Sequence, residues 1–315
     1  MNESADTAKG TSYGIGLKIL SVCVFLAMSS LIKATTHHVP AGEAVFFRSF
    51  FAIPAILLWF AWRGQFRDSF RTSNPQGHFL RGLAGVSAMF LGFSALGLIP
   101  LPEVVAIGYA APLLSTILAA MFLGERVRLY RLAAVAFGLA GVMLILSPRL
   151  QGLDQNDASA PQAVGALIAF MGAVFAAMAS VFVRKLVNTE KTATIVIYFS
   201  ITAALLSLFT LPFGWVWPTA KEVGMLVLAG VLGGIGQILL TESYRHAETA
   251  VIASFEYVSM VLALAVGHLV FGEVATKPML AGAVLVVGAG LVILYRERQL
   301  GIERAKSRRV MTPQG

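Results

Sequence analysis

Long apolar runs of about 20 residues, separated by short polar segments, constrain this chain more than any other feature. A helix of this length crosses roughly 30 Å of hydrocarbon, whereas the strands of a membrane barrel alternate in polarity over about 10 residues. The runs do not alternate, and 57% hydrophobic against 13% charged residues excludes a soluble fold. We therefore expect an all-α polytopic membrane protein with ten transmembrane helices, near residues 14–34, 43–62, 79–97, 103–123, 129–147, 163–183, 192–212, 222–241, 249–270 and 278–295.

The basic residues between these runs indicate how the chain is oriented. Of 24 lysines and arginines, we assign 18 to the side that holds both termini and three to the opposite loops. The remaining three, Lys18, Lys33 and Arg48, lie within or at the ends of spans. Because short cytoplasmic loops carry the excess of basic residues, both termini are predicted in the cytoplasm, in a bacterial inner (plasma) membrane. The basic tail, 296–315, favours contact with membrane lipid, and we expect no nucleic-acid partner.

The chain also resembles itself when it is shifted by 148 residues. The shift aligns 79–135 with 227–283 without a gap, and ten of the 57 aligned positions are identical, among them the pairs Gly82/Gly230, Gly85/Gly233, Tyr109/Tyr257 and Glu125/Glu273. A repeat unit of five spans is odd, so the second copy must cross the membrane in the opposite direction. We expect two inverted five-helix repeats, 14–147 and 163–295, followed by the cytoplasmic tail.

Paired motifs in the two halves resemble the drug/metabolite transporter superfamily, of the type with two EamA domains. They are Tyr109-Ala-Ala-Pro112 leading to Leu123-Gly124-Glu125, and Phe255-Glu256-Tyr257-Val258 leading to Phe271-Gly272-Glu273. The resemblance implies ten helices around a central substrate cavity that opens alternately to each side. Members of this superfamily export amino acids and toxic compounds, or import vitamins, S-adenosylmethionine and other metabolites. The segments 33–35 and 43–51 look most like the bacterial riboflavin importers.

One position departs from the family pattern. Members often have proline after the acidic residue of the ninth span, where this chain has Tyr257. A proline-induced helix break is therefore expected at Pro112 in the first half and is in doubt in the second.

Five polar or aromatic residues inside the spans are candidate substrate-binding residues: Arg48, Tyr109, Gln237, Glu256 and Tyr257. An ionised carboxylate inside a span is costly, so Glu256 is either a proton or substrate relay or a hydrogen-bonded structural group. Arg48 either binds an anionic group, pairs with Glu256 or extends to the outer headgroups. The two tyrosines offer rings and hydroxyls at equivalent places, although helix packing explains them nearly as well. Gln237 either lines the site or bonds between helices.

Other residues carry weaker signals. Tyr198 and Trp59 are more typical of core or interface aromatics, and His268 of an interhelical hydrogen bond. Glu125 and Glu273 stand at span ends, where each is expected to meet the N-terminal dipole of the next helix. His37 and His38 lack further metal ligands, so we expect no metal site, and no motif indicates a cofactor.

These features predict a secondary transporter of a small organic metabolite, with riboflavin or a similar heteroaromatic as the first substrate to test. The sequence has no phosphate-binding loop that would indicate ATP and no acid/base constellation that would indicate a membrane enzyme. Coupling to protons and facilitated diffusion remain alternative transport mechanisms. Two other functions stay open, an exporter of amino acids or toxic compounds and a lipid flippase. The sequence leaves the direction of transport and the oligomeric state open.

Overall fold

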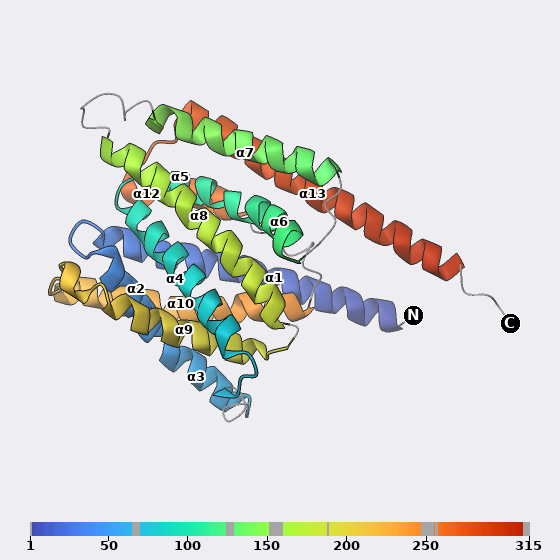
Figure 1. Ribbon diagram of the computed structural model, residues 1–315, viewed down its shortest axis with the longest axis horizontal. Coiled ribbons are helices and arrows are strands. Elements are labelled where there is room, and N and C mark those ends of the chain that lie inside the picture. The colour runs from blue at the N-terminus through green and yellow to red at the C-terminus, as the bar shows by residue number, and fades with distance from the viewer. Residues whose placement is uncertain are drawn as a thin grey trace.

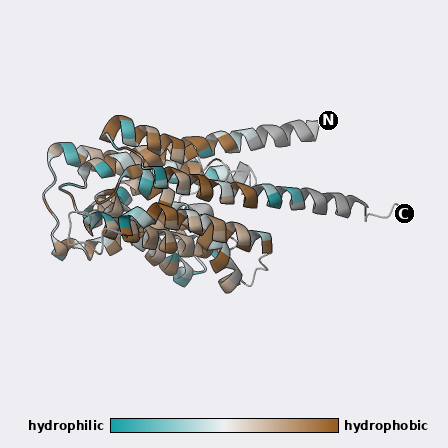
Figure 2. Ribbon diagram, turned by 90° about the horizontal axis from the view of Figure 1, so that it is seen from above, coloured by the Kyte–Doolittle hydropathy of each residue, from teal (hydrophilic) through white to brown (hydrophobic). Residues whose placement is uncertain are grey.

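Apolar helices lie side by side in one bundle, with hydrophobic residues along their middle sections, in the computed structural model (Figures 1 and 2). The structure describes residues 2–64, 70–123, 129–150, 160–187, 189–246, 255 and 258–310. Its helices are α1 (Asn2–Thr35), α2 (Ala41–Phe50), α3 (Ala52–Trp62), α4 (Pro75–Leu96), α5 (Leu101–Gly108), α6 (Ala110–Leu123), α7 (Leu129–Leu150), α8 (Ala160–Val187), α9 (Thr192–Leu208), α10 (Ala220–His246), α12 (Val258–Phe271) and α13 (Lys277–Val310), with a 3-10 helix at Leu211–Phe213.

The expected fold class is confirmed. Among the described residues, seven helical stretches are long and apolar enough to cross a membrane, and three shorter apolar helices match the remaining expected spans. The start of α1 and the end of α13 project from the same end of the bundle, as an even number of spans requires (Figure 1). Part of the ninth expected span, 249–254 and 256–257, lies outside the described residues.

Prolines divide two of the expected spans into pairs of helices. A proline has no N–H to bond the carbonyl four residues earlier, and its ring collides with that carbonyl. The carbonyl four residues before Pro54 belongs to Phe50, the last residue of α2. The carbonyl four residues before Pro112 belongs to Gly108, the last residue of α5. The helix break expected at Pro112 is therefore present, at Tyr109. Pro54 causes a second helix break, at Phe51, which the apolar runs do not predict.

The helices pack as two inverted halves. α1 packs along α10, and α8 packs along α4, and the 148-residue shift converts one pair into the other. α6 and α12 also begin and end 148 residues apart. α1 and α8, which the shift relates, run in opposite directions through the bundle (Figure 1). α2 meets α9 and α7 meets α13, so each of these contacts joins equivalent helices of the two halves.

Small residues allow these helices to approach closely. A Cβ atom added to Gly141 of α7 would lie 2.7 Å from the Gly282 carbonyl oxygen, and one added to Gly282 of α13 would lie 2.5 Å from the Gly141 carbonyl oxygen. The glycine run of α10 packs in the same way, since a Cβ at Gly230 would lie 2.9 Å from the Phe47 carbonyl oxygen. Membrane interiors offer little hydrophobic drive between helices, so such close packing supplies much of the association. α10 stays continuous through this glycine run.

Candidate functional site

Arg48 lies on α2 with its side chain inside the bundle. The residue is 5% exposed, so it does not extend to the outer headgroups, which was one of the alternatives from the sequence. Its guanidinium carbon lies 5.8 Å from the centre of the Phe199 ring on α9. Gly233 of α10 is beside it, where an added Cβ would lie 3.0 Å from Arg48 Nε. Arg48 thus lies where α2, α9 and α10 meet.

A second arginine, Arg81, meets the same aromatic ring from α4. Its guanidinium carbon lies 3.5 Å from the centre of the Phe199 ring, and the residue is 8% exposed. Arg81 is one of the 18 basic residues that we assign to the side of the termini, and it stands at the beginning of the expected span 79–97. Because α4 begins earlier, at Pro75, Arg81 lies in the second turn of the helix and is buried. The Asn74 side chain caps the helix by accepting a hydrogen bond from Gly77 N (2.9 Å), and Pro75 follows at the first helical position. The Asn74-Pro75 pair was the signal that could have placed Arg81 inside the bundle.

His78 and Tyr198 continue this group toward the end of the bundle where the termini lie. The two rings stack with centres 4.7 Å apart, one helical turn before Arg81 on α4 and one residue before Phe199 on α9. His78 Nε2 is 3.8 Å from a carboxylate oxygen of Glu190, in the loop between α8 and α9. We call these residues the polar column: Glu190, His78, Tyr198, Arg81, Phe199 and Arg48.

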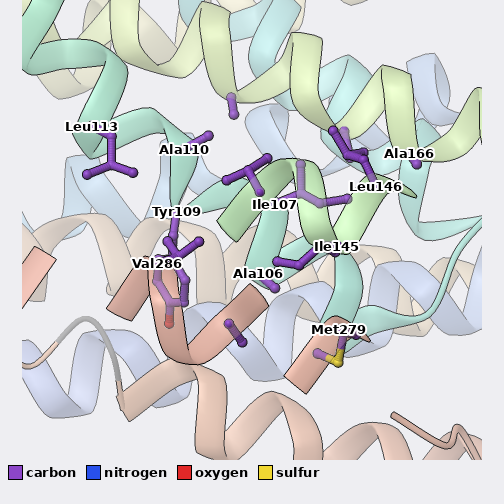
Figure 3. Packing of buried hydrophobic residues seen from close by; sticks show 14 of the residues in the cluster. Ala106, Ile107, Tyr109, Ala110, Leu113, Ile145, Leu146, Ala166, Met279 and Val286 are labelled. Carbon is purple, nitrogen blue, oxygen red and sulfur yellow. The ribbon is translucent and has the colours of Figure 1, made fainter. Parts of the chain in front are cut away.

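Of the other expected site residues, the structure describes Gln237 and Tyr109. Gln237 is half-buried on α10, one turn beyond Gly233 and so on the side of α10 that meets Arg48. Tyr109 follows the last residue of α5 and is buried among apolar residues that include Val286. Its hydroxyl is directed toward α12 (Figure 3). That hydroxyl lies 2.5 Å from Ser259 Oγ. Glu256 and Tyr257 lie outside the described residues, so their roles stay predictions.

An ion-pair network lies at the end of the bundle opposite the termini. Lys33 Nζ of α1 is 2.8 Å from Glu273 and donates to the carbonyls of Leu96 and Ile99, both at 3.0 Å. The other Glu273 oxygen accepts a hydrogen bond from Leu101 N (2.9 Å), at the start of α5. Glu273 therefore caps a helix, as expected, but that helix is α5 of the first half and not the next helix in sequence.

Gly272 explains why glycine precedes this glutamate. It ends α12 with φ +66°, a left-handed backbone conformation that favours glycine. The turn brings Glu273 back toward the bundle, where its N–H donates to the Gly267 carbonyl (2.9 Å). The equivalent Gly124 and Glu125 lie outside the described residues.

Histidines in the loop between α1 and α2 contact a carboxylate. His38 Nδ1 is 3.0 Å and His37 Nε2 is 3.7 Å from oxygens of Glu222, at the start of α10. No group of three or more His, Cys, Asp or Glu side chains suited to a metal occurs within the described residues. His268 is exposed on α12, and Trp59 of α3 lies beside Arg63 and packs against the same apolar cluster as Tyr198.

Hydrogen bonds to the Glu190 carboxylate join the loop before α4 to the loop before α9. One carboxylate oxygen accepts hydrogen bonds from Thr72 Oγ1 (2.8 Å), Ser73 N (2.8 Å), Ser73 Oγ (3.0 Å) and Asn74 N (3.1 Å). Burial alone would raise the pKa of Glu190, but the hydrogen bonds from Thr72, Ser73 and Asn74 outweigh it and hold the pKa below its ordinary value. The ionised carboxylate therefore stabilises the start of α4.

We expect Glu190→Gln to lower the stability of the folded protein at neutral pH. The depressed pKa means that the contribution of Glu190 is present above the pKa of the unfolded chain and is lost as pH falls through the folded pKa. The wild-type protein should therefore lose more stability on acidification than the variant. Denaturant unfolding in detergent between pH 7 and pH 3 measures this difference. Parallel pH curves for the two proteins would contradict the role given to the carboxylate.

Comparisons with known proteins agree with this architecture. A sequence profile of the EamA-like transporter family matches residues 12–147 and 163–295. An S-adenosylmethionine uptake transporter of Rickettsia bellii is 27% identical over 93% of this chain and 97% of its own length. A pseudopaline exporter of Pseudomonas aeruginosa is 31% identical over 89% of this chain and 95% of its own length.

Two further similarities concern the riboflavin resemblance and the fold. A riboflavin transporter of Rhizobium johnstonii is 29% identical over 72% of each chain, which supports the resemblance to that group. A solved crystal structure matches with a TM-score of 0.65 at 23% identity, over 92% of this chain and 99% of that chain, and this likeness shows the fold alone. The matched relatives are named as transporters of small molecules and not as enzymes. Because the family profile covers both halves, this multi-pass membrane protein belongs to the EamA-like transporter family.

Proposed function

We propose that the protein is a secondary transporter that moves a small organic metabolite across the bacterial inner membrane by alternating access. The observation that carries this proposal is the inverted packing of the two halves, with α2 against α9 and α7 against α13. Two inverted halves can exchange conformations, which opens one site to either side in turn. Riboflavin or a similar heteroaromatic is the first substrate to test, supported by the similarity to a riboflavin transporter.

The functional halves in this proposal are residues 14–147 and 163–295, with 296–315 as a cytoplasmic tail. Both termini then face the cytoplasm, because the loops on their side carry most of the lysines and arginines. The polar column begins on that side, at Glu190 in the loop between α8 and α9.

The proposed substrate-binding residues are Arg48, Tyr109, Gln237, Glu256 and Tyr257. Arg48 supplies a cation next to Gly233 of α10, one helical turn from Gln237, and Tyr109 lies at the break between α5 and α6 where it contacts Ser259 of the second half. Glu256 is the candidate proton relay.

Uptake of labelled riboflavin into proteoliposomes tests this proposal. We expect saturable, protein-dependent flux that competes with unlabelled riboflavin. If Glu256 relays a proton, Glu256→Gln should lower the rate and remove its dependence on pH. An unchanged rate and pH profile would leave facilitated diffusion as the mechanism. No protein-dependent riboflavin flux, together with amino-acid efflux from cells that express the protein, would favour the exporter.

A lipid flippase is the second candidate, because an apolar pocket of about 510 Å³ lies between α3 and α10. Its lining residues are Ala55, Leu58, Trp59, Trp62, Ile235, Ile238 and Leu239. This lining suits an acyl chain but offers no polar path for a headgroup. Flux of a fluorescent phospholipid between leaflets, faster than in protein-free liposomes, would favour the flippase over the metabolite transporter.

A further inference from the structure

Arg48 and Arg81 differ from three other basic residues of the bundle in the partners of their side chains. Lys33, Arg63 and Arg149 each pair with a glutamate, at distances between 2.8 and 3.3 Å. The described residues place no carboxylate in hydrogen-bond or ion-pair contact with Arg48 or Arg81. Arg48 Nε and the Nε and Nη1 atoms of Arg81 are buried and have no hydrogen-bond partner.

The contacts that these arginines do make are too weak to offset their burial. An unpaired cation costs several kcal/mol when it leaves water. A cation–π contact returns about 0.5–2 kcal/mol, and the two arginines share one ring, that of Phe199. Their like charges also repel each other at this short range. An unfavourable arrangement of this kind is typical of a binding site whose ligand supplies the missing charge.

The neutral groups nearby add hydrogen-bond donors. Within the described part of the chain, the buried side-chain atoms without partners belong to Arg48, Ser49, His78, Arg81 and Thr194. These residues lie on α2, α4 and α9, three helices that pack against one another. Unpartnered hydroxyl and guanidinium donors on helices in mutual contact are suited to oxyanions.

Glycines at equivalent places in the two halves leave room for the two guanidinium groups. A Cβ at Gly85 would lie 2.8 Å from the Phe199 ring and 3.1 Å from Arg81 Nη1. A Cβ at Gly233 would lie 3.0 Å from Arg48 Nε. Gly85 and Gly233 are one of the identical pairs at the 148-residue shift, so each half contributes one such glycine.

We infer that Arg48 and Arg81, which meet at the Phe199 ring, bind the oxyanion group of the transported molecule, a phosphate or a pair of carboxylates. The inference rests on the proposed transport function and narrows its substrate class to organic anions. Each guanidinium presents N–H donors that match two oxygens of a carboxylate or phosphate. Riboflavin itself is uncharged and would leave both arginines unneutralised, whereas a phosphorylated or carboxylated heteroaromatic would neutralise them.

Matched pairs of probes test the inference by thermal unfolding of the purified full-length protein in detergent at constant ionic strength. The pairs are riboflavin 5′-phosphate with riboflavin, and benzene-1,3-dicarboxylate with benzene-1,3-dicarboxamide. Inorganic phosphate is a third arm. We expect the charged member of at least one pair to raise the unfolding temperature saturably and the neutral member to leave it unchanged. A response to the phosphates alone, or to the dicarboxylate alone, would identify which oxyanion is bound. Equal shifts from both members of each pair, or no shift from any anion, would overturn the inference.

Variants locate the binding and distinguish it from a structural role. Arg48→Met and Arg81→Met should each weaken anion binding at least about tenfold. The matched control, Arg71→Met, replaces an exposed arginine of the loop before α4 and should bind as the wild type does. Without ligand, the two buried variants should unfold at a higher temperature than the wild type, because an unpaired charge has been removed. A lower unfolding temperature for both would show that the arginines hold the fold, and would overturn the inference.

The outcomes separate this inference from the proposed function. Flux of riboflavin 5′-phosphate that persists at the wild-type rate in Arg48→Met and Arg81→Met would leave transport standing and refute the anion site. Anion binding without flux of any probe in proteoliposomes would keep the site and refute transport of these probes.

Discussion

Lys33→Ala is expected to lower the free energy of unfolding by about 3–5 kcal/mol, because it leaves Glu273 unpaired in a nearly buried position. The Lys33 and Glu273 side chains are 11% and 14% exposed, and the pair joins α1 to the loop after α12. The same ammonium group also donates to the carbonyls of Leu96 and Ile99, between α4 and α5. One substitution therefore loosens three connections at the end of the bundle opposite the termini. Denaturant titration in detergent measures the loss.

A double variant tests whether the loss comes from the uncompensated carboxylate. In Lys33→Met with Glu273→Gln, the buried charges are gone and the amide oxygen can still accept the hydrogen bond from Leu101 N. We expect the double variant to be more stable than Lys33→Ala. Lys221→Ala, which removes an exposed lysine at the start of α10, is the control and should change stability little. If Lys33→Ala and Lys221→Ala are equally stable, the ion pair contributes nothing measurable.

The sequence predicted which residues form the apolar helices better than it predicted which way each side chain points. Apolar runs measure helix length against the bilayer, so the spans and the inverted repeat followed from length, charge and self-comparison. The face that a helix turns to its neighbours leaves no such pattern, because lipid tails are as apolar as the protein interior. The contact of Arg81 with Phe199 and the contact of Lys33 with Glu273 were therefore not predicted.

Local signals would have recovered part of what was missed. Pro54 predicts the end of α2 at Phe50 by the same rule that was applied to Pro112. The Asn74-Pro75 start of α4 brings His78 and Arg81 onto one helix with Gly85. That Phe199 lies against both Arg48 and Arg81 is a tertiary arrangement, and no spacing in one sequence indicates it. Arg48 lies inside a candidate span, Ala41–Trp62, as expected, whereas its neighbours Phe199 and Arg81 were not predicted.

Gly282→Ala is expected to lower the free energy of unfolding by about 1–3 kcal/mol, the range typical of an overpacked interior. The added Cβ would lie 2.5 Å from both the Gly141 carbonyl oxygen and Ile145 Cγ1, so α7 and α13 must separate. The backbone oxygen cannot turn aside as a flexible side chain would. Since α7 and α13 are equivalent helices of the two halves, this contact is one of the places where the halves join.

Gly288→Ala on the same helix is the matched control, because a Cβ there meets no atom within 4 Å. It should be neutral or slightly stabilising, since alanine favours a helix over glycine. Gly141→Ala should act like Gly282→Ala, and the double variant should lose less than the sum of the two, because the first substitution has already separated the helices. Denaturant titrations of the four variants measure these changes in the free energy of unfolding. If Gly282→Ala and Gly288→Ala lower the free energy of unfolding equally, then glycine at position 282 matters for the backbone conformation of α13 and not for its contact with α7.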